Sequence, residues 1–163
     1  MTDIQTYARR RASLLAQMQL GIAIVPTAPE RMRNRDSAYL YRFDSYFYYL
    51  CGFQEPEAVL VLIAGAEPQS LLFCREKNPE RETWDGFRFG PEAAKEALGV
   101  DAAYPIAQLE EKLPALIANQ PALHYAPGAD PEWDARVMRW MNQVRAQSRI
   151  GISVPHSIHD IRS

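Results

Sequence analysis

The side chains best suited to chemistry gather near the C-terminal end, in the run His156-Ser-Ile-His159-Asp160. Imidazole nitrogens are common metal ligands, and a neighbouring carboxylate could complete or orient a metal site. Histidines three residues apart face one ligand only on a turn of helix, which Pro155 disfavours. Metal binding is therefore the minor interpretation of this run, and a polar tail segment is the favoured one.

Other reactive side chains have simpler explanations. His124 lies within the apolar run ALHYA (122–126), where a hydrogen-bonded core or edge histidine is expected. Glu55 and Glu57 flank Pro56, and turn chemistry explains them without an acid–base pair. The sequence contains no GxSxG, GxGxxG, GxxxxGK[ST] or HExxH motif, so the usual signatures of nucleophilic, nucleotide and zinc chemistry are missing.

Length and composition limit the function classes. The chain has 163 residues, of which 47% are hydrophobic and 23% are charged. These values predict one globular domain with a real core, and they do not accommodate a large multidomain enzyme. Cys51 and Cys74 both lie in apolar surroundings and are expected to be buried thiols rather than a disulfide framework.

Charge and hydropathy indicate neither a nucleic-acid nor a membrane partner. The net charge is −2, and the one dense basic run, Arg9-Arg10-Arg11, is interpreted as the solvated face of a helix. No apolar stretch approaches the roughly 20 residues that cross a bilayer. The first residues lack the apolar run of a secretory signal, so we expect a cytoplasmic protein.

Hydrophobic periodicity predicts alternating helices and strands. Helices are expected at 3–20, 46–53, 91–99, 106–118 (kinked or broken at Pro114) and 131–147, with Asp130 as the last N-cap. Strands are expected at 21–25, 58–64, 70–76, around 104, at 122–126 and within 149–163 before a polar tail. Segments 30–45 and 77–91 are expected to be loops, the second with one helical turn. The strands 58–64 and 70–76 should form an antiparallel hairpin, within a mixed α/β sheet that has helices on both faces.

One long segment resembles a known family. The residues from Asp36 to Ile63, DSAYLYRFDSYFYYLCGFQEPEAVLVLI, are similar to a signature of the N-terminal domain of aminopeptidase P, also called Xaa-Pro aminopeptidase. Asp44-Ser45 is reversed relative to the family's pattern, and Cys51 replaces the usual threonine. Further similar blocks follow the family's order, namely YARRRASLLAQM, the Trp-x-Gly-x-Arg-x-Gly pattern at 84–90, and HDIR at 159–162.

The resemblance implies that residues 1–163 form a creatinase/prolidase-type N-terminal domain with a ribonuclease H-like motif. In the family, a separate pita-bread domain holds two metal ions, typically manganese, and removes the N-terminal residue that precedes proline. A metal-activated hydroxide attacks the scissile carbonyl there. By resemblance, this chain lacks that domain, binds no metal and is inactive alone. Its expected partners are its own C-terminal catalytic domain, a peptide with proline at the second position, and further copies in a dimer or tetramer.

The resemblance also points to three substrate-binding positions. Asp36 could pair with a substrate's α-ammonium group, or it could form an ordinary Asx turn. Trp84 could form a wall of the pocket, including a neighbouring subunit's pocket, because an indole packs well on proline's ring. An ordinary core or interface role is its alternative. Arg149 could hold a carboxylate bidentately, or it could be a solvated surface arginine.

Two further expectations concern the chain by itself. A self-contained α/β binding module without peptidase activity is the alternative function. If the chain does belong beside a catalytic domain, apolar or aromatic side chains that face that domain should be exposed here. Residues 39–48 and the surroundings of Trp84 are the candidates.

Overall fold

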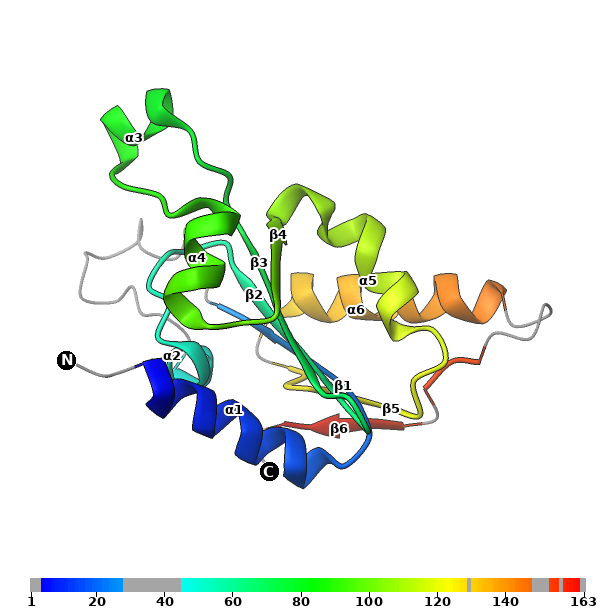
Figure 1. Cartoon of the computed structure of the whole chain (residues 1–163). Coiled ribbons are helices and arrows are strands. Elements are labelled where there is room, and N and C mark those ends of the chain that lie inside the picture. Colours follow the sequence, from blue (N-terminus) through cyan, green and yellow to red (C-terminus); the bar gives the residue numbers. More distant parts are fainter. Residues whose placement is uncertain (1–3, 28–44, 129, 148–152, 156, 162–163) are drawn as a thin grey trace.

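A mixed sheet with the strand order β4-β3-β2-β1-β5-β6 forms the centre of the fold (Figure 1). The computed structural model describes residues 4–27, 45–128, 130–147, 153–155 and 157–161. The strands are β1 (Gly21–Pro26), β2 (Val59–Ala64), β3 (Gln69–Cys74), β4 (Ala102–Pro105), β5 (Ala122–Tyr125) and β6 (Ser157–Asp160). Strand β2 is antiparallel to β1 and β3, which confirms the predicted hairpin, whereas the β3–β4, β1–β5 and β5–β6 pairs are parallel.

The apolar run of β2 is covered on both faces, as the sequence predicts. Val59 and Val61 pack into the core on one side of the sheet. Leu60 and Leu62 pack into the core on the other side. Successive side chains of a strand point to opposite faces, so an uninterrupted apolar strand requires two cores.

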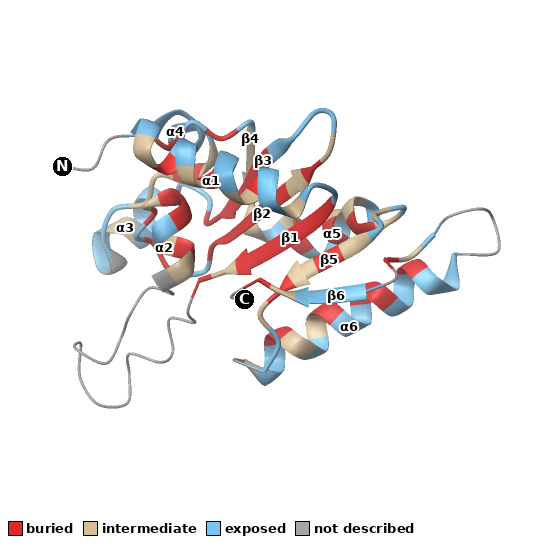
Figure 2. Ribbon diagram, turned by 90° about the horizontal axis from the view of Figure 1, so that it is seen from below, coloured by how far each residue is buried: buried red, intermediate tan, exposed pale blue. Residues whose placement is uncertain are grey.

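Helices cover both faces of the sheet, which confirms the expected architecture (Figures 1 and 2). Helices α1 (Ile4–Met18), α2 (Ser45–Cys51) and α4 (Gly90–Leu98) contribute to one core. The 3₁₀ turn η3 (Ile106–Gln108) and helices α5 (Leu109–Ile117) and α6 (Pro131–Ala146) lie on the opposite face. Helix α3 (Pro79–Asp85) projects away from the sheet at one end of the molecule (Figure 1).

Local signals place several helix ends correctly. Asp130 Oδ1 accepts hydrogen bonds from the backbone N–H groups of Glu132 (3.0 Å) and Trp133 (3.4 Å), so it is the N-cap of α6. Gly99 ends α4 with a left-handed φ of 70°, a conformation that glycine adopts without strain. Pro114 lies inside α5 without dividing it, so of the two predicted alternatives at this proline, a kink or a break, the break does not occur.

The interpretation of Arg9-Arg10-Arg11 as a solvated face is wrong for Arg11. This side chain is buried, and its guanidinium donates to the carbonyl oxygens of Leu50 (3.1 Å) and Leu98 (2.9 Å). Carbonyl groups in the last turn of a helix lack intrahelical partners. Arg11 supplies those partners at the ends of α2 and α4, which explains a charged residue on the buried face of α1.

The C-terminal segment contains a strand where a polar tail was the favoured interpretation. Strand β6 pairs with β5 at the edge of the sheet, so that His159 lies opposite His124. Their rings stack with centroids 5.1 Å apart. His156 lies outside the described residues. Among the helices that are described, none is both long and apolar enough to cross a membrane.

Candidate functional site

Residues 77–89 connect β3 to α4 through a projecting segment that we call the Trp84 arm (Figure 1). Its centre is α3, a fuller helix than the single turn expected there. Asn78 caps this helix, because its Oδ1 accepts from the backbone N–H of Arg81 at 3.2 Å, and Pro79 is its first residue. Gly86 then turns the chain at a φ of 94°. The arm thus holds a short ordered helix away from the sheet.

The arm presents two large aromatic side chains to solvent. Trp84 is 86% exposed and Phe87 is 64% exposed. Trp84 is therefore not a core residue of this chain, and the expected exposure near it is confirmed. Exposed indole and phenyl rings on one short segment are typical of a contact surface. The same expectation is wrong for Phe47, which is fully buried, and residues 39–44 lie outside the described residues.

A charged pair closes the arm upon itself. The ammonium Nζ of Lys77 donates to Glu82 Oε1 at 3.0 Å and to the carbonyl oxygen of Arg88 at 2.8 Å. The same Glu82 oxygen accepts from the backbone N–H of Arg88 at 3.1 Å. The Arg88 N–H group, followed by Lys77, holds the pKa of Glu82 below its usual value, so this carboxylate is charged. One ion pair therefore joins the start, the helix and the end of the arm.

A second carboxylate ties the end of the arm to the body of the fold. Glu55 Oε2 accepts from the backbone N–H of Phe89 at 2.7 Å, and Oε1 lies 3.4 Å from Arg75 Nη2. Glu55 and Arg75 are both buried. The phenyl ring of Phe89 packs between Phe53 and the exposed Phe87, at centroid distances of 5.7 and 5.2 Å. Glu55 thus anchors the arm, which the turn interpretation of this residue did not foresee.

A cavity of about 490 Å³ lies at the foot of the arm. Four basic and two acidic side chains line it with Asn78 and Ile106: Arg75, Lys77, Arg81, Arg88, Glu57 and Glu76. Charged and amide groups of this kind bind polar ligand groups by hydrogen bonds and Coulomb attraction. The lining includes no thiol, hydroxyl or imidazole; it consists of charged side chains, one amide and one aliphatic side chain.

The described residues do not fit a dinuclear metal centre. Within them, no three His, Cys, Asp or Glu side chains are grouped so as to hold an ion. Cys51 and Cys74 are both free and buried, as expected, and burial raises the pKa of each thiol to about 12. His124 hydrogen-bonds through Nε2 to the carbonyl of Leu20 at 3.3 Å, which agrees with the expectation of a hydrogen-bonded histidine, although β5 is an inner strand and not an edge.

Of the three substrate-binding positions suggested by resemblance, only Trp84 can be placed. Asp36 and Arg149 lie outside the described residues. The sequence did not reveal Lys77, Glu82 or Phe87 as parts of the same arm. The Trp-x-Gly-x-Arg-x-Gly pattern marks this segment, but it does not show which side chains close it.

The sheet order, the two helical layers and the projecting arm define a creatinase-like N-terminal domain of mixed α/β type. Residues 7–124 match the family model described as the aminopeptidase P N-terminal domain, and the chain belongs to this family.

Curated relatives and solved structures agree with this assignment. The chain is 38% identical to Xaa-Pro aminopeptidase of Escherichia coli over 161 residues, which make up 97% of the chain and 36% of that protein. It is 36% identical to human Xaa-Pro aminopeptidase 3 over 133 residues, or 73% of the chain and 26% of the relative. The chain thus spans about a third or less of the curated relatives it matches.

The solved structures are also longer proteins. An aminopeptidase of Pseudomonas aeruginosa superposes with a TM-score of 0.89 at 46% identity, covering 98% of this chain and 36% of that one. Aminopeptidase P of E. coli superposes with a TM-score of 0.91 at 38% identity, covering 99% and 38%. The E. coli enzyme has also been solved in zinc-substituted form in complex with product.

Proposed function

We propose that this chain is the non-catalytic N-terminal domain, residues 1–163, of a dinuclear-metal Xaa-Pro aminopeptidase. The observation that carries the proposal is family membership together with a span of about a third of each closely matching enzyme. The complete enzyme would remove the N-terminal residue that precedes proline. Its cellular location would be the cytoplasm.

The domain would shape the substrate entrance. The 86% exposure of Trp84, on an arm that projects from the sheet, supports this role (Figure 1). An indole offers a flat apolar face for proline's ring, in its own active site or in that of a neighbouring subunit. Asp36 would pair with the substrate's α-ammonium group, and Arg149 would hold a carboxylate. The exposed rings of the arm would also contribute to contacts in a homodimer or homotetramer.

The metal ions would belong to the joined catalytic domain. Two manganese ions would activate water for attack on the scissile carbonyl. The residues of this chain would bind and orient the peptide.

The direct test is a peptidase assay on the purified chain with manganese and a Xaa-Pro peptide, beside the full-length enzyme as the positive control. The proposal expects no cleavage by the chain alone. Proline-specific cleavage that co-purifies with the chain through successive columns would overturn it.

A stand-alone α/β binding module is the alternative, and the coding sequence after Ser163 separates the two. A continuation with spaced Asp, Asp, His, Glu and Glu supports the enzyme domain. A native stop codon at that point supports the module.

A further inference from the structure

We infer that Lys77 and Glu82 are positioning residues for Trp84: their ion pair closes the Trp84 arm and thereby fixes where the indole is presented. The effect of this pair on substrate rests on the proposed function. The effect on the arm itself does not, because it follows from contacts within this chain.

The geometry makes Lys77 the centre of the closure. Its Nζ lies 3.0 Å from Glu82 Oε1, 2.8 Å from the carbonyl oxygen of Arg88, and 4.1 Å from the centroid of the Phe87 ring. An ammonium group that contacts a carboxylate, a carbonyl oxygen and an aromatic ring at the same time is restricted to one position. The three partners come from α3 and from the chain that returns from it, so Lys77 joins both halves of the arm.

Glu82 is held from the opposite direction. Its Oε1 also accepts from the backbone N–H of Arg88 at 3.1 Å. The backbone N–H of Glu82 donates to the carbonyl oxygen of Asn78 at 3.0 Å, and the carbonyl oxygen of Glu82 accepts from the backbone N–H of Gly86 at 3.1 Å. The buried Oε2 has no hydrogen-bond partner among the described residues, so the anchoring depends on Oε1. Trp84 lies between Glu82 and Gly86 in the sequence. The contacts that hold Glu82 and Gly86 in place therefore also hold the backbone of Trp84.

The contact of Glu55 has a different role from the Lys77–Glu82 ion pair. Glu55 binds the backbone of Phe89 from the buried side and attaches the foot of the arm to the core. It does not reach the helix that carries Trp84. Loss of the Lys77–Glu82 pair should therefore loosen the tip of the arm while its foot stays attached. Because the Lys77 side chain is 49% exposed, little stability should be lost.

Time-resolved tryptophan anisotropy of the 163-residue chain tests the arm directly. Trp133 and Trp140 are buried and in contact with each other, so their contribution to fast depolarisation should be the same in every variant. A change in fast depolarisation between variants therefore reports on Trp84. We expect K77A and E82A each to raise the amplitude of this depolarisation by about twofold. K77R, which can donate to the same partners, should restore the original amplitude. K95A and E80A, which alter exposed charges on α4 and α3, are the matched controls and should change nothing.

Unchanged anisotropy in folded K77A and E82A would overturn the inference, and so would equal changes in K95A or E80A. Circular dichroism establishes that each variant is folded. K77M, which keeps the aliphatic stem without the ammonium, replaces K77A if that variant unfolds.

A double-mutant cycle in the full-length enzyme tests the effect on substrate. K77A should raise KM for a Xaa-Pro peptide with little change in kcat, and K77A combined with W84A should be no worse than W84A alone. Additive losses would show that Lys77 acts independently of Trp84 and would overturn the positioning role. If W84A itself has no effect, the proposed function fails, whereas the anisotropy result still decides whether the pair holds the arm.

Discussion

Arg11 in α1 donates a hydrogen bond from Nη2 to the carbonyl oxygen of Leu98, 87 residues away, at 2.9 Å. The other terminal nitrogen, Nη1, donates to the carbonyl oxygen of Leu50 at 3.1 Å. These carbonyls lie at the C-terminal ends of α4 and α2. One buried guanidinium therefore joins three helices on the same face of the sheet, and its burial lowers its pKa.

Replacing Arg11 should destabilise the fold strongly. R11A leaves two buried carbonyl groups without partners, so we expect a loss of about 2–4 kcal/mol in the free energy of unfolding. Urea denaturation measures this loss. R9A, at an exposed position of the same helix, is the control and should cost less than about 0.5 kcal/mol. Equal effects of the two substitutions would contradict the bridging role.

The stacked pair His124 and His159 should make the fold sensitive to acid. Burial holds the pKa of His124 below the ordinary value for histidine. The hydrogen bond to the Leu20 carbonyl opposes this shift in pKa, and repulsion from His159 adds to it. The unfolded chain therefore binds a proton more readily than the folded one. Stability from this group is full above about pH 6.5 and is lost as the pH falls towards the lower, folded-state value.

Thermal melts across pH 5 to 8 check this dependence. H124Q, which can still donate to the Leu20 carbonyl but does not titrate, should flatten the acid side of the profile. An unchanged slope in H124Q would show that another group is responsible.

Both cysteines should resist alkylation in the folded chain. Cys51 and Cys74 are buried, and burial raises the pKa of each thiol to about 12, so the reactive thiolate is scarce at neutral pH. Iodoacetamide at pH 8, followed by mass spectrometry, should show no labelling under native conditions and two labels in urea. Rapid native labelling would require a more open structure around either residue.

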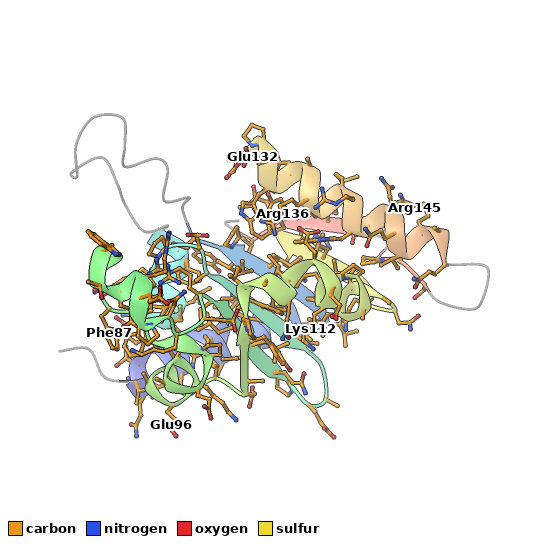
Figure 3. The ribbon with its side chains drawn as sticks, turned by 90° about the horizontal axis from the view of Figure 1, so that it is seen from above. Phe87, Glu96, Lys112, Glu132, Arg136 and Arg145 are labelled. Atoms are coloured by element: carbon orange, nitrogen blue, oxygen red, sulfur yellow. The ribbon has the colours of Figure 1, made fainter. Side chains whose placement is uncertain are left out.

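Glu110 should stabilise the packing of α5 against α6. Its carboxylate accepts from Trp140 Nε1 at 2.9 Å and from Arg136 and Arg139 of α6 at 2.9 and 2.8 Å; Figure 3 shows Arg136 between the two helices. E110A should cost about 1–2 kcal/mol, mainly because the indole N–H of the buried Trp140 loses its acceptor. The half-exposed arginine pairs should add little. Chemical denaturation measures the loss, and E111A, an exposed neighbour, should have almost no effect.

The sequence predicts the parts of the fold that depend on local patterns. Each of three predictions rests on a pattern only a few residues long, and the structure confirms all three. They are the buried strand β2 from its apolar run, the start of α6 at Asp130 and the end of α4 at Gly99. Arg11 could not be interpreted in this way, because its role depends on two helix ends that are distant in the sequence.

The same limit applies to the site. The family pattern singled out Trp84, which the structure shows exposed on the arm, and its role in substrate binding stays a prediction. Lys77 and Glu82 are five residues apart, a spacing that does not place two side chains together on a regular helix. They meet only because the chain turns into α3 just after Lys77. The strand pairing of His159 likewise needed β5, which lies more than thirty residues earlier.

The central claim is that Trp84 belongs to the substrate entrance of a Xaa-Pro aminopeptidase, and kcat/KM of W84A in the full-length enzyme tests it most directly. Loss of the indole should lower kcat/KM for a Xaa-Pro peptide by about tenfold, equivalent to about 1.4 kcal/mol, with W84F retaining most of the activity. Wild-type kcat/KM in W84A would contradict the account.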